Sequence, residues 1–553
     1  MVTPHKPLGP NDPAHFTKES KILIVGGGPA GINFIFSKKK KKKKKIMIII
    51  NITQGVHMGH LLKKNGFLNF EILEETPDVG GKSKTIYREQ DGRMIPHEMG
   101  TCFLHQGYKR IMNLLDTYEV TPYLKTGGEF YDSIIFFLSF QFSIFLINQI
   151  KIINFFFKKK ECNIYAPKLR KEKGEDPTQP QFILDWMFSD VEKKVVNRSC
   201  WCLPDQFQIL TVLDAIERYS KLHYSLFGEY EYTIPPRPDK STMDKINMTF
   251  GEFVKKHQLD ALVPIFTLGN AAQGYGLLET IPAYYGLWWN TPALLSALVE
   301  RKPLTLMVQK GYLALWKAIN EKDELPTTCN AKVVSINRNL DDKNKPVEVE
   351  AIVNGEPKTY ECDFLIITSP LQPALELLKD CLEDEKKVFS VLKAASLVTS
   401  LVKGDICHDG ERATTYLPER LTVQEQGRFY AERNSFKAIF PTDPQPTDYQ
   451  VTVAYQYYEE FKEGREEEAK TQLMKDLHEF GYKQPEILEQ YAFSYFPKFS
   501  QQYLNEMYPY KILEMQGKNK TWYAGSSACF ESVEDVVAYN HLLFKLFLKI
   551  DSK

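Results

Sequence analysis

A glycine-rich stretch near the N-terminus carries the clearest chemistry in the sequence. Residues 21–31 read KILIVGGGPAG, with a short apolar run, Ile22–Val25, ahead of glycines at three spaced positions. The run predicts a buried strand, and the G-x-G-x-x-G spacing permits a tight turn, close approach of backbone to a pyrophosphate and close helix packing. Free N–H groups at the helix start would hold the phosphates. The residues expected to bind a dinucleotide cofactor are Gly26, Gly28, Pro29, Ala30 and Gly31.

The acidic partner of such a motif usually lies about 20 residues further on, at the end of the next strand. Here Glu74 ends the predicted strand Phe70–Leu73, but it follows Gly31 by 43 residues. The intervening residues 33–56 contain eight consecutive lysines and an isoleucine-rich run, and removal of these 24 residues leaves a spacing of 19. The joined sequence has strand, loop, a helix ended by Asn65-Gly66, strand and acid in the expected order.

We therefore interpret residues 33–56 as a translated non-coding insert that would have to loop out of the nucleotide site. Their lysine, isoleucine, asparagine and phenylalanine content is that of codons built only from A and T. A nuclear-targeting patch and a membrane-surface patch are the alternative functional interpretations of the lysine run.

Residues 73–85, LEETPDVGGKSKT, resemble the ribose-binding acid, short linker and GG-R-x-x-T segment of the flavin-containing amine oxidase superfamily. The resemblance implies FAD as cofactor, with Glu74 on the ribose and Gly81 and Lys82 beside it. The glycine pair favours FAD over the alternative, an NAD-binding domain of the same Rossmann type. Lys82 stands where the family usually has arginine, which keeps the charge but loses the planar fork, so a weaker phosphate contact is expected.

Further segments resemble the same superfamily. Glu98 to Thr101 match the turn that packs on the isoalloxazine, so Gly100 and Thr101 are implied cofactor contacts. Residues 308–319 resemble its glycine turn and following helix, and Cys329–Asn339 its adenine-side strand, in which Val333 is the implied contact.

The C-terminal run WYAGSS followed by ESVED resembles the superfamily's last strand, glycine turn and final helix. It implies cofactor contacts from Gly525, Ser532 and Val533, with N–H groups of the helix facing the flavin. Asp535 stands where the family usually has glycine. This end, together with the run from YFPKFS to WYAGSS, is most similar to the branch that contains FAD-dependent polyunsaturated fatty acid isomerases.

The implied fold is α/β: a Rossmann-type FAD-binding domain (GR2-like, amine-oxidase fold) interleaved with an α+β substrate domain. We expect the FAD-binding domain at 20–110, 301–380 and 511–553. The substrate domain is expected to be mainly helical at 111–300 and to form a sheet with one helix at 381–510. The patterns predict helices at Tyr108–Tyr118, Ile209–Leu222, Met248–Gln258, Arg465–Phe480 and Tyr539–Phe547, strands at Phe364–Thr368 and Val451–Tyr458, and a hairpin turn at Asn354-Gly355.

A second anomalous stretch, Ser133–Asn163, is again rich in phenylalanine, isoleucine, lysine and asparagine. Its apolar part, Ile134–Phe157, is long enough to span a bilayer. Five polar or charged residues within it argue against a lipid-facing helix, so we interpret the stretch as a second translated insert.

The length and composition of the chain limit the number of domains and the classes of binding partner. The 553 residues predict two or more domains, and the formal net charge of zero indicates no general attraction to nucleic acid or anionic membrane. Nine scattered cysteines form no disulfide framework or zinc pair, so no metal is expected. A reducing, cytoplasmic location and an apolar or amine small-molecule substrate are expected. The aromatic stretch Gly274–Asn290 suits an apolar pocket, although a helical core is the alternative.

The resemblance implies an FAD-dependent oxidoreductase in which a substrate C–H loses a hydride to flavin N5. One alternative is an isomerase, which returns the hydride to another carbon of a polyunsaturated fatty acid. A second alternative is a non-catalytic chain disabled by the inserts. No catalytic side chain is fixed by a motif, and His97 and His105 are interpreted as ordinary polar residues rather than acid–base groups.

Overall fold

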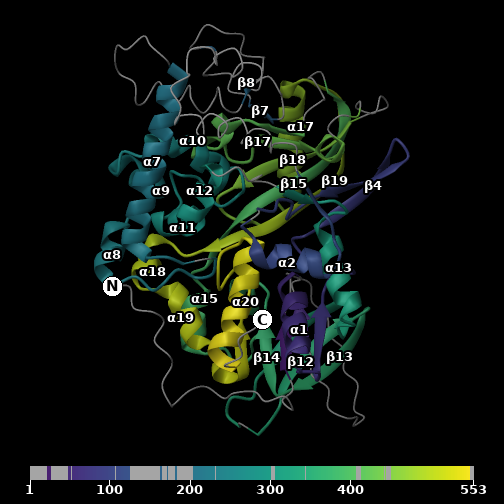
Figure 1. Ribbon diagram of the computed structural model, residues 1–553. Coiled ribbons are helices and arrows are strands. Elements are labelled where there is room, and N and C mark those ends of the chain that lie inside the picture. The colour runs from purple at the N-terminus through teal and green to yellow at the C-terminus, as the bar shows by residue number, and fades with distance from the viewer. Residues whose placement is uncertain are drawn as a thin grey trace.

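The computed structural model describes residues 22–25, 48–50, 53–105, 107–124, 162–164, 171, 181–182, 204–230, 232–299, 306–342, 344–406, 413–440, 443 and 450–548. In Figure 1 a parallel sheet lies in the lower half of the molecule and a larger, mostly antiparallel sheet in the upper half. Each sheet takes strands from distant parts of the chain, so the two halves are interleaved in sequence.

The parallel sheet has the strand order β10, β3, β1, β14, β20. These strands span Thr327–Thr328, Phe70–Glu74, Ile22–Val25, Phe364–Ile367 and Thr521–Tyr523. The described side chains of β14 and β20 are all buried, as expected for parallel strands covered on both faces. The predicted strands Ile22–Val25 and Phe70–Leu73 are confirmed, and with them the Rossmann-type α/β fold.

A further strand, β2 (Ile48–Ile50), pairs with β3 in parallel. Ile48 lies opposite Ile72 of β3. Ile24 of β1, which precedes Ile48 by 24 positions, also pairs with Ile72. Helix α1 (Thr53–Lys64) follows directly and ends before Gly66, whose φ is +82°. The expectation that all of residues 33–56 loop out is therefore wrong for 48–50 and 53–56. The isoleucine run 48–50 pairs with β3 as β1 does, and residues 53–56 form the first turn of α1.

Four helices pack around the parallel sheet in Figure 1: α1, α2 (Lys109–Thr117), α13 (Tyr312–Lys322) and α20 (Val533–Leu548). An antiparallel sheet of β11 (Ala331–Asn337), β12 (Val347–Val353) and β13 (Glu356–Cys362) lies beside them. Its hairpin turns at Asn354 and Gly355, both with positive φ, which confirms the predicted turn. The same half holds α14 (Leu371–Ala374), α15 (Glu383–Phe389), α18 (Gln501–Asn505) and α19 (Tyr508–Met515).

The larger sheet has the order β19, β15, β18, β17, β16, β7, β8. These strands span Tyr482–Lys498, Lys393–Ile406, Gln450–Tyr458, Phe429–Asn434, Thr414–Tyr416, Cys162–Ile164 and Gln181–Phe182. Helix α17 (Glu466–Phe480) covers one face, and α16 (Ser435–Ile439) adds a helix that the sequence did not predict. Cys162 and Asn163, the last two residues of the second proposed insert, form part of β7. Its apolar part lies outside the described residues.

Helices flank the larger sheet on the left in Figure 1: α7 (Pro204–Phe227), α8 (Lys240–Lys245), α9 (Phe250–Lys256), α10 (Val263–Phe266), α11 (Ala283–Trp289) and α12 (Pro292–Val299). Helix α9 is shorter than predicted because Thr249 and Glu252 form a capping box at its start. Two short ribbons complete the fold: β4 (Thr85–Gln90) with β5 (Arg93–Glu98), and β6 (Pro122–Leu124) with β9 (Leu306–Val308).

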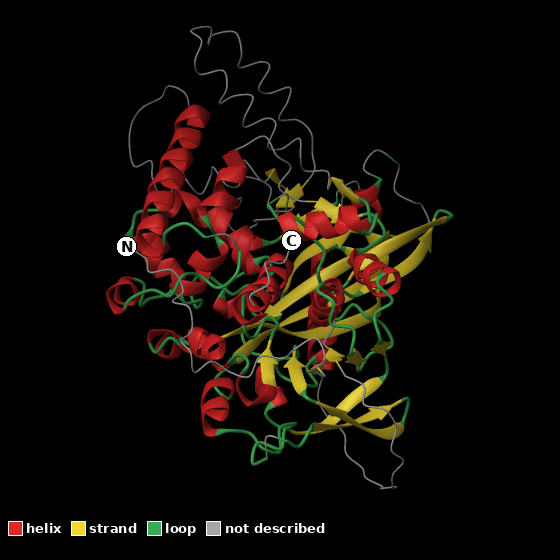
Figure 2. Cartoon of the chain, turned by 60° about the horizontal axis from the view of Figure 1, so that its bottom comes forward, coloured by secondary structure: helices red, strands yellow, loops and turns green. Residues whose placement is uncertain are grey.

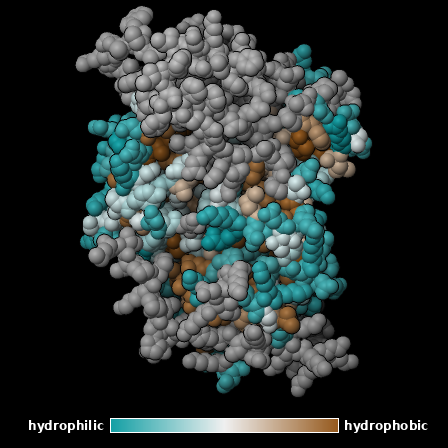
Figure 3. All heavy atoms as spheres, in the orientation of Figure 1, coloured by the Kyte–Doolittle hydropathy of each residue, from teal (hydrophilic) through white to brown (hydrophobic). Residues whose placement is uncertain are grey.

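Figure 2 shows the long strands of the larger sheet crossing the centre of the molecule, with helices gathered on one side. A hydrogen bond connects the two halves: the Thr399 hydroxyl on β15 donates to the backbone carbonyl of Met99 over 2.6 Å. The face in Figure 3 is mostly hydrophilic where it is described, with hydrophobic residues in small separate patches. Among the described residues no helix is long and apolar enough to cross a membrane.

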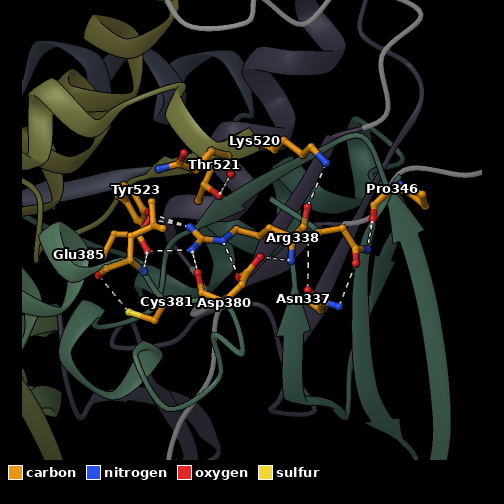
Figure 4. A network of polar contacts seen from close by, with 12 residues as sticks. Asn337, Arg338, Pro346, Asp380, Cys381, Glu385, Lys520, Thr521 and Tyr523 are labelled. Carbon is orange, nitrogen blue, oxygen red and sulfur yellow. Dashed lines mark hydrogen bonds and ion pairs between the residues drawn. The ribbon is translucent and has the colours of Figure 1, made fainter. Parts of the chain in front are cut away.

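A buried polar network ties β11 to β20 (Figure 4). The fully buried Arg338, directly after β11, contacts Asp380, Glu385 and the hydroxyl of Tyr523. The Lys520 ammonium donates to the Arg338 carbonyl over 3.0 Å. The network fixes the antiparallel sheet against the last strand of the parallel sheet.

Candidate cofactor and substrate site

The carboxyl ends of β3, β14 and β20 meet at one edge of the parallel sheet. Glu74 ends β3, Ser369 follows β14, and Gly525 follows β20 with φ +98°. In open α/β sheets this edge is where nucleotides bind. The glycine motif that follows β1 (Gly26, Gly28, Pro29, Ala30 and Gly31) lies outside the described residues.

Glu74 presents an unused carboxylate oxygen at this edge. Its Oε1 accepts from the backbone N and the hydroxyl of Thr76, over 2.6 and 2.5 Å. Its Oε2 is buried and has no hydrogen-bond partner within the described chain. Burial raises the pKa of Glu74 to about 8, because the charged form loses its hydration. Such an oxygen suits a ligand that supplies hydroxyl donors, as a ribose does.

The GG-K segment and the Glu98–Thr101 turn are held together by backbone contact. A Cβ on Gly100 would lie 1.7 Å from the Lys82 carbonyl oxygen, and Thr101 N donates to that oxygen over 2.8 Å. Gly81 has φ +52°. Glycine at position 100 is therefore needed for packing on Lys82; a contact of Gly100 with the flavin ring stays a prediction.

Lys82 points toward the C-terminal motif. Its Nζ lies 2.6 Å from Glu531 Oε1 and 5.3 Å from the centre of the Tyr495 ring. The structure therefore gives this ammonium a carboxylate partner within the chain. The phosphate contact expected from the sequence stays a prediction.

Glu98 holds the start of α13. Its Oε2 accepts from the Thr85 hydroxyl over 2.7 Å, and its Oε1 accepts from the backbone N of Tyr312. Burial raises the pKa of Glu98 to about 7. Neighbouring His97 is fully buried, and burial lowers its pKa to about 3, so it stays neutral. His105 Nδ1 accepts from the backbone of Gly107 over 2.9 Å, as a turn residue does.

The start of α20 connects three parts of the molecule. The Ser532 hydroxyl accepts from Asp535 N over 3.1 Å and also pairs with Asp535 Oδ2. Asp535 Oδ1 accepts from Trp288 Nε1 on α11 over 3.2 Å and from Thr233 N over 3.1 Å. The side chain that stands in place of the family's glycine thus fixes the substrate helices to the cofactor helix. Burial raises the pKa of Asp535 to about 7.

On the same turn, Glu534 accepts from the backbone N of Arg110 and of Ile111 at the start of α2. Val533 is buried in the first turn of α20. Val333 lies in the middle of β11, paired with Ala351 at a register shift. The predicted residues Val333, Ser532 and Val533 thus lie on the expected elements, and their contacts with a cofactor stay predictions.

Five aromatic side chains gather beside Lys82 and the start of α20, and we call them the aromatic wall: Tyr275, Trp289, Tyr495, Phe496 and Phe530. The rings of Trp289 and Phe530 are stacked, with centroids 5.5 Å apart, and Tyr275 is stacked on Tyr495 at 5.9 Å. Tyr275 also meets Phe530 edge-on at 5.0 Å. The predicted stretch Gly274–Asn290 therefore contributes Tyr275 and Trp289 to an apolar cluster next to the implied cofactor residues, in which Trp289 and Tyr495 are only partly buried.

Comparison with known proteins agrees with this geometry. The sequence model of the family of flavin containing amine oxidoreductases matches residues 290–538. The polyenoic fatty acid isomerase of Ptilota filicina is 22% identical over 517 residues, which cover 87% of this chain and 90% of that protein. Residues 290–538 thus carry the sequence pattern of flavin containing amine oxidoreductases.

Solved structures show the same fold. The fatty acid isomerase from P. acnes that produces CLA has a TM-score of 0.65 at 18% identity, covering 96% of this chain and 99% of that chain. Wild-type putrescine oxidase bound to putrescine has a TM-score of 0.55 at 13% identity, covering 97% of this chain and 99% of that chain. Both confirm the fold implied by the motifs.

FAD is the cofactor of this FAD-dependent oxidoreductase family, and the described residues fit it. Glu74 offers a buried acceptor for ribose hydroxyls, Gly100 packs where only glycine fits, and α20 begins shortly after the carboxyl end of β20. Glu74 ends β3 and α20 follows β20, and these two strands lie on opposite sides of β1 in the parallel sheet.

Sequence reasoning missed the aromatic wall residues Tyr495, Phe496 and Phe530, and the role of Glu531. Tyr495 and Phe496 lie in the YFPKFS run that carried the resemblance to the isomerase branch, so a signal was present without a role attached to it. Glu531 stands directly before the implied cofactor residue Ser532, and nothing local in the sequence marks its partner at Lys82.

Proposed function

We propose that this protein is an FAD-dependent double-bond isomerase of polyunsaturated fatty acids. The observation that carries the proposal is the aromatic wall, an apolar cluster beside the implied flavin residues whose partly exposed rings, Trp289 and Tyr495, would contact a long acyl chain. The relatedness to the polyenoic fatty acid isomerase over most of both chains supports the same assignment.

The charges near the wall favour an acyl chain over an amine. Within the described residues, Glu531 pairs with Lys82, and Glu459 with Lys498 at 3.4 Å. Asp535 is occupied by Trp288, Thr233 and Ser532. A diamine would have to displace one of these contacts to obtain a carboxylate partner, whereas an apolar chain leaves them intact.

In this proposal FAD supplies a reversible acceptor for hydride. The protein residues orient the substrate and enclose it. The aromatic wall holds the unsaturated carbons. Asp535 binds Trp288 and thereby fixes helix α11 to the start of α20. Glu98 and Thr85 set the start of α13 against the turn that carries Gly100. Because an isomerase has no net redox change, no external electron acceptor is consumed.

The test incubates the FAD-loaded protein with a polyunsaturated fatty acid in the absence of oxygen and records the ultraviolet absorbance of conjugated dienes. A rising diene band, with the flavin still oxidised at the end, supports the isomerase. Bleaching of the flavin by putrescine, with peroxide on readmission of air, would instead assign an amine oxidase, the activity of a structural neighbour. Bound flavin that responds to neither compound contradicts both functions. A cytoplasmic location stays a prediction.

A further inference from the structure

The backbone of Phe496 is held in a conformation that its sequence disfavours. Its φ is +51°, in the left-handed region that bulky residues rarely occupy. The next residue is Pro497, and a residue before proline favours an extended backbone. Phe496 is buried at the end of β19, where the pairing with β15 shifts register between Lys393 and Ala395. A bulge of this kind re-aims the side chains next to it.

Glu531 supplies the contact that holds this bulge. Its Oε2 accepts from Phe496 N over 2.8 Å, and its Oε1 lies 2.6 Å from Lys82 Nζ. The Glu531 side chain is only 5% exposed, so both contacts form away from bulk water, where they are strongest. One carboxylate therefore joins β19, the GG-K segment and the turn before α20.

The side chain directed by the bulge is Tyr495. Its ring lies parallel to that of Tyr275 with an interplanar angle of 10°, and the Lys82 ammonium lies 5.3 Å from its centre. Gly274 leaves room for the ring, since a Cβ there would lie 3.0 Å from Tyr495. Tyr495 is thus fixed by Tyr275 on one side and by the Lys82–Glu531 pair on another.

We infer that Glu531 is a positioning residue: it holds the Phe496 bulge and, through Lys82, fixes the ring of Tyr495 as a wall of the fatty acid site. The role of the ring toward substrate rests on the proposed function, while the positioning itself does not. A residue in a strained backbone state persists only where its surroundings hold it, and such states concentrate at functional sites.

The first test places 3-fluorotyrosine at position 495 of the FAD-loaded protein and records its ¹⁹F NMR signal. One narrow signal is expected in the otherwise unchanged chain. Glu531→Ala should shift it or split it into two, because both contacts are lost. Glu531→Gln keeps an oxygen acceptor for Phe496 N and should shift it less. Glu534→Gln, which alters an acid of the same segment that contacts α2, should leave it unchanged. An unchanged signal in Glu531→Ala overturns the inference.

Variants of Lys82 distinguish the two contacts of Glu531, one with Phe496 N and the other with Lys82 Nζ. Lys82→Arg keeps a cation for Glu531 and for the Tyr495 ring, so the signal should stay single. Lys82→Met removes the cation but leaves the carboxylate on Phe496, so the signal should shift without splitting. If Glu531→Ala fails to fold, Glu531→Gln and Lys82→Met still test the inference. A Tyr495 ¹⁹F signal identical to that of the parent protein in both variants would overturn it.

Backbone rescue provides the sharpest control. In the Glu531→Ala background, Phe496→Gly can adopt positive φ without strain, whereas Phe496→Ala cannot, and both lack the ring. The glycine variant should restore a single Tyr495 signal and the alanine variant should not. Equal signals in the two double variants would contradict a role of Glu531 in holding the bulge.

A second readout connects the positioning to substrate. Binding of a saturated long-chain fatty acid, followed by the change in flavin absorbance, should weaken about tenfold in Glu531→Ala and stay unchanged in Arg88→Met, which alters an exposed ion pair. If the parent protein binds no fatty acid, the proposed function fails while the ¹⁹F result stands. If the parent binds and Glu531→Ala binds equally well, the wall role of Tyr495 is wrong.

Discussion

Arg338 and Glu385 form a two-pronged ion pair, in which Nη1 and Nη2 of the arginine donate to different carboxylate oxygens over 2.6 and 2.8 Å. Both side chains are almost completely buried (Figure 4). Burial lowers the pKa of the arginine, but the hydrogen bond to Glu385 and the charges of Tyr523, Glu385 and Asp380 together more than offset this, so the pKa is raised overall. The pair stays charged and anchors the end of β11 to α15 and, through Tyr523, to β20.

Removal of one partner should therefore be costly. Arg338→Met leaves the Glu385 carboxylate buried without its cation, and we expect unfolding free energy to fall by about 3–5 kcal/mol. Denaturant unfolding followed by tryptophan fluorescence measures the change. Arg88→Met is the matched control, because the Arg88–Glu489 pair is much more exposed, and it should cost under about 1 kcal/mol. Equal losses in the two variants would show that the network does not anchor the fold.

The repeated pairing of Ile24 and Ile48 with Ile72 yields a prediction about cofactor binding. Deletion of residues 33–56 and deletion of residues 22–45 each remove 24 residues and leave a strand, a loop and α1 at the same spacing. The first keeps the glycine motif, whereas the second puts Ile50 and Ile52 in place of Gly26 and Gly28.

Only the first deletion variant should bind FAD, because side chains at the first two glycine positions block the close approach of backbone to pyrophosphate. Flavin absorbance after gel filtration with FAD measures binding, and circular dichroism checks that both variants are folded. A yellow protein from the second deletion would contradict the assignment of the glycine motif to the cofactor.

Glu74 predicts a proton linked to FAD binding. Its pKa is about 8 in the cofactor-free structure, so near pH 7 the folded protein holds a proton that the unfolded chain, with an ordinary carboxyl pKa, has released. This contribution to stability is present at acidic pH and is lost as pH rises through about 8. Ribose hydroxyls that donate to the carboxylate favour its charged form, so FAD binding should release up to about one proton.

Calorimetry of FAD binding near pH 7 in buffers of different ionisation enthalpy counts this proton. Glu74→Gln should abolish the release. Glu432→Gln is the control, since burial also raises the pKa of Glu432 to about 7 but Glu432 lies in the other sheet, bonded to Tyr482. Proton release that persists in Glu74→Gln would exclude Glu74 as the linked group.

Three histidines between α1 and α20 predict acid sensitivity. His57 lies 5.2 Å from His541 and 5.9 Å from His60, ring centre to ring centre. Burial lowers the pKa of all three, that of His541 to about 4. Since the unfolded chain binds these protons from pH about 6.5 downward and the folded chain does not, stability should fall as pH drops from about 6.5 toward 4.

His541→Gln removes one of these groups and should reduce the slope by up to about 1.4 kcal/mol per pH unit. Thermal or denaturant unfolding across that pH range gives the slope. His478→Gln, at an exposed position on α17, should leave the slope as it is. A slope that does not respond to His541→Gln would place the acid sensitivity elsewhere.

The sequence by itself determined the nucleotide-binding end of the molecule. Local signals suffice there, because they are features of continuous chain: the strand pattern and spacing predicted Phe70–Glu74, and the Asn-Gly pair predicted the hairpin turn at Asn354-Gly355. The sequence did not set the limits of the two unusual segments as well. Isoleucine-rich residues such as Ile48–Ile50 can form a buried strand of the sheet, as Ile22–Val25 does.

The tertiary structure alone decided the substrate side. Lys82 and Glu531 are 449 residues apart, and Trp288 and Asp535 are 247 apart, so no local pattern brings either pair together. The backbone of Phe496 goes against its local preference, because a distant carboxylate holds it. His97, an acid–base candidate by residue type, is neutral because the fold buries it. These features depend on long-range packing, which spacing along the chain does not encode.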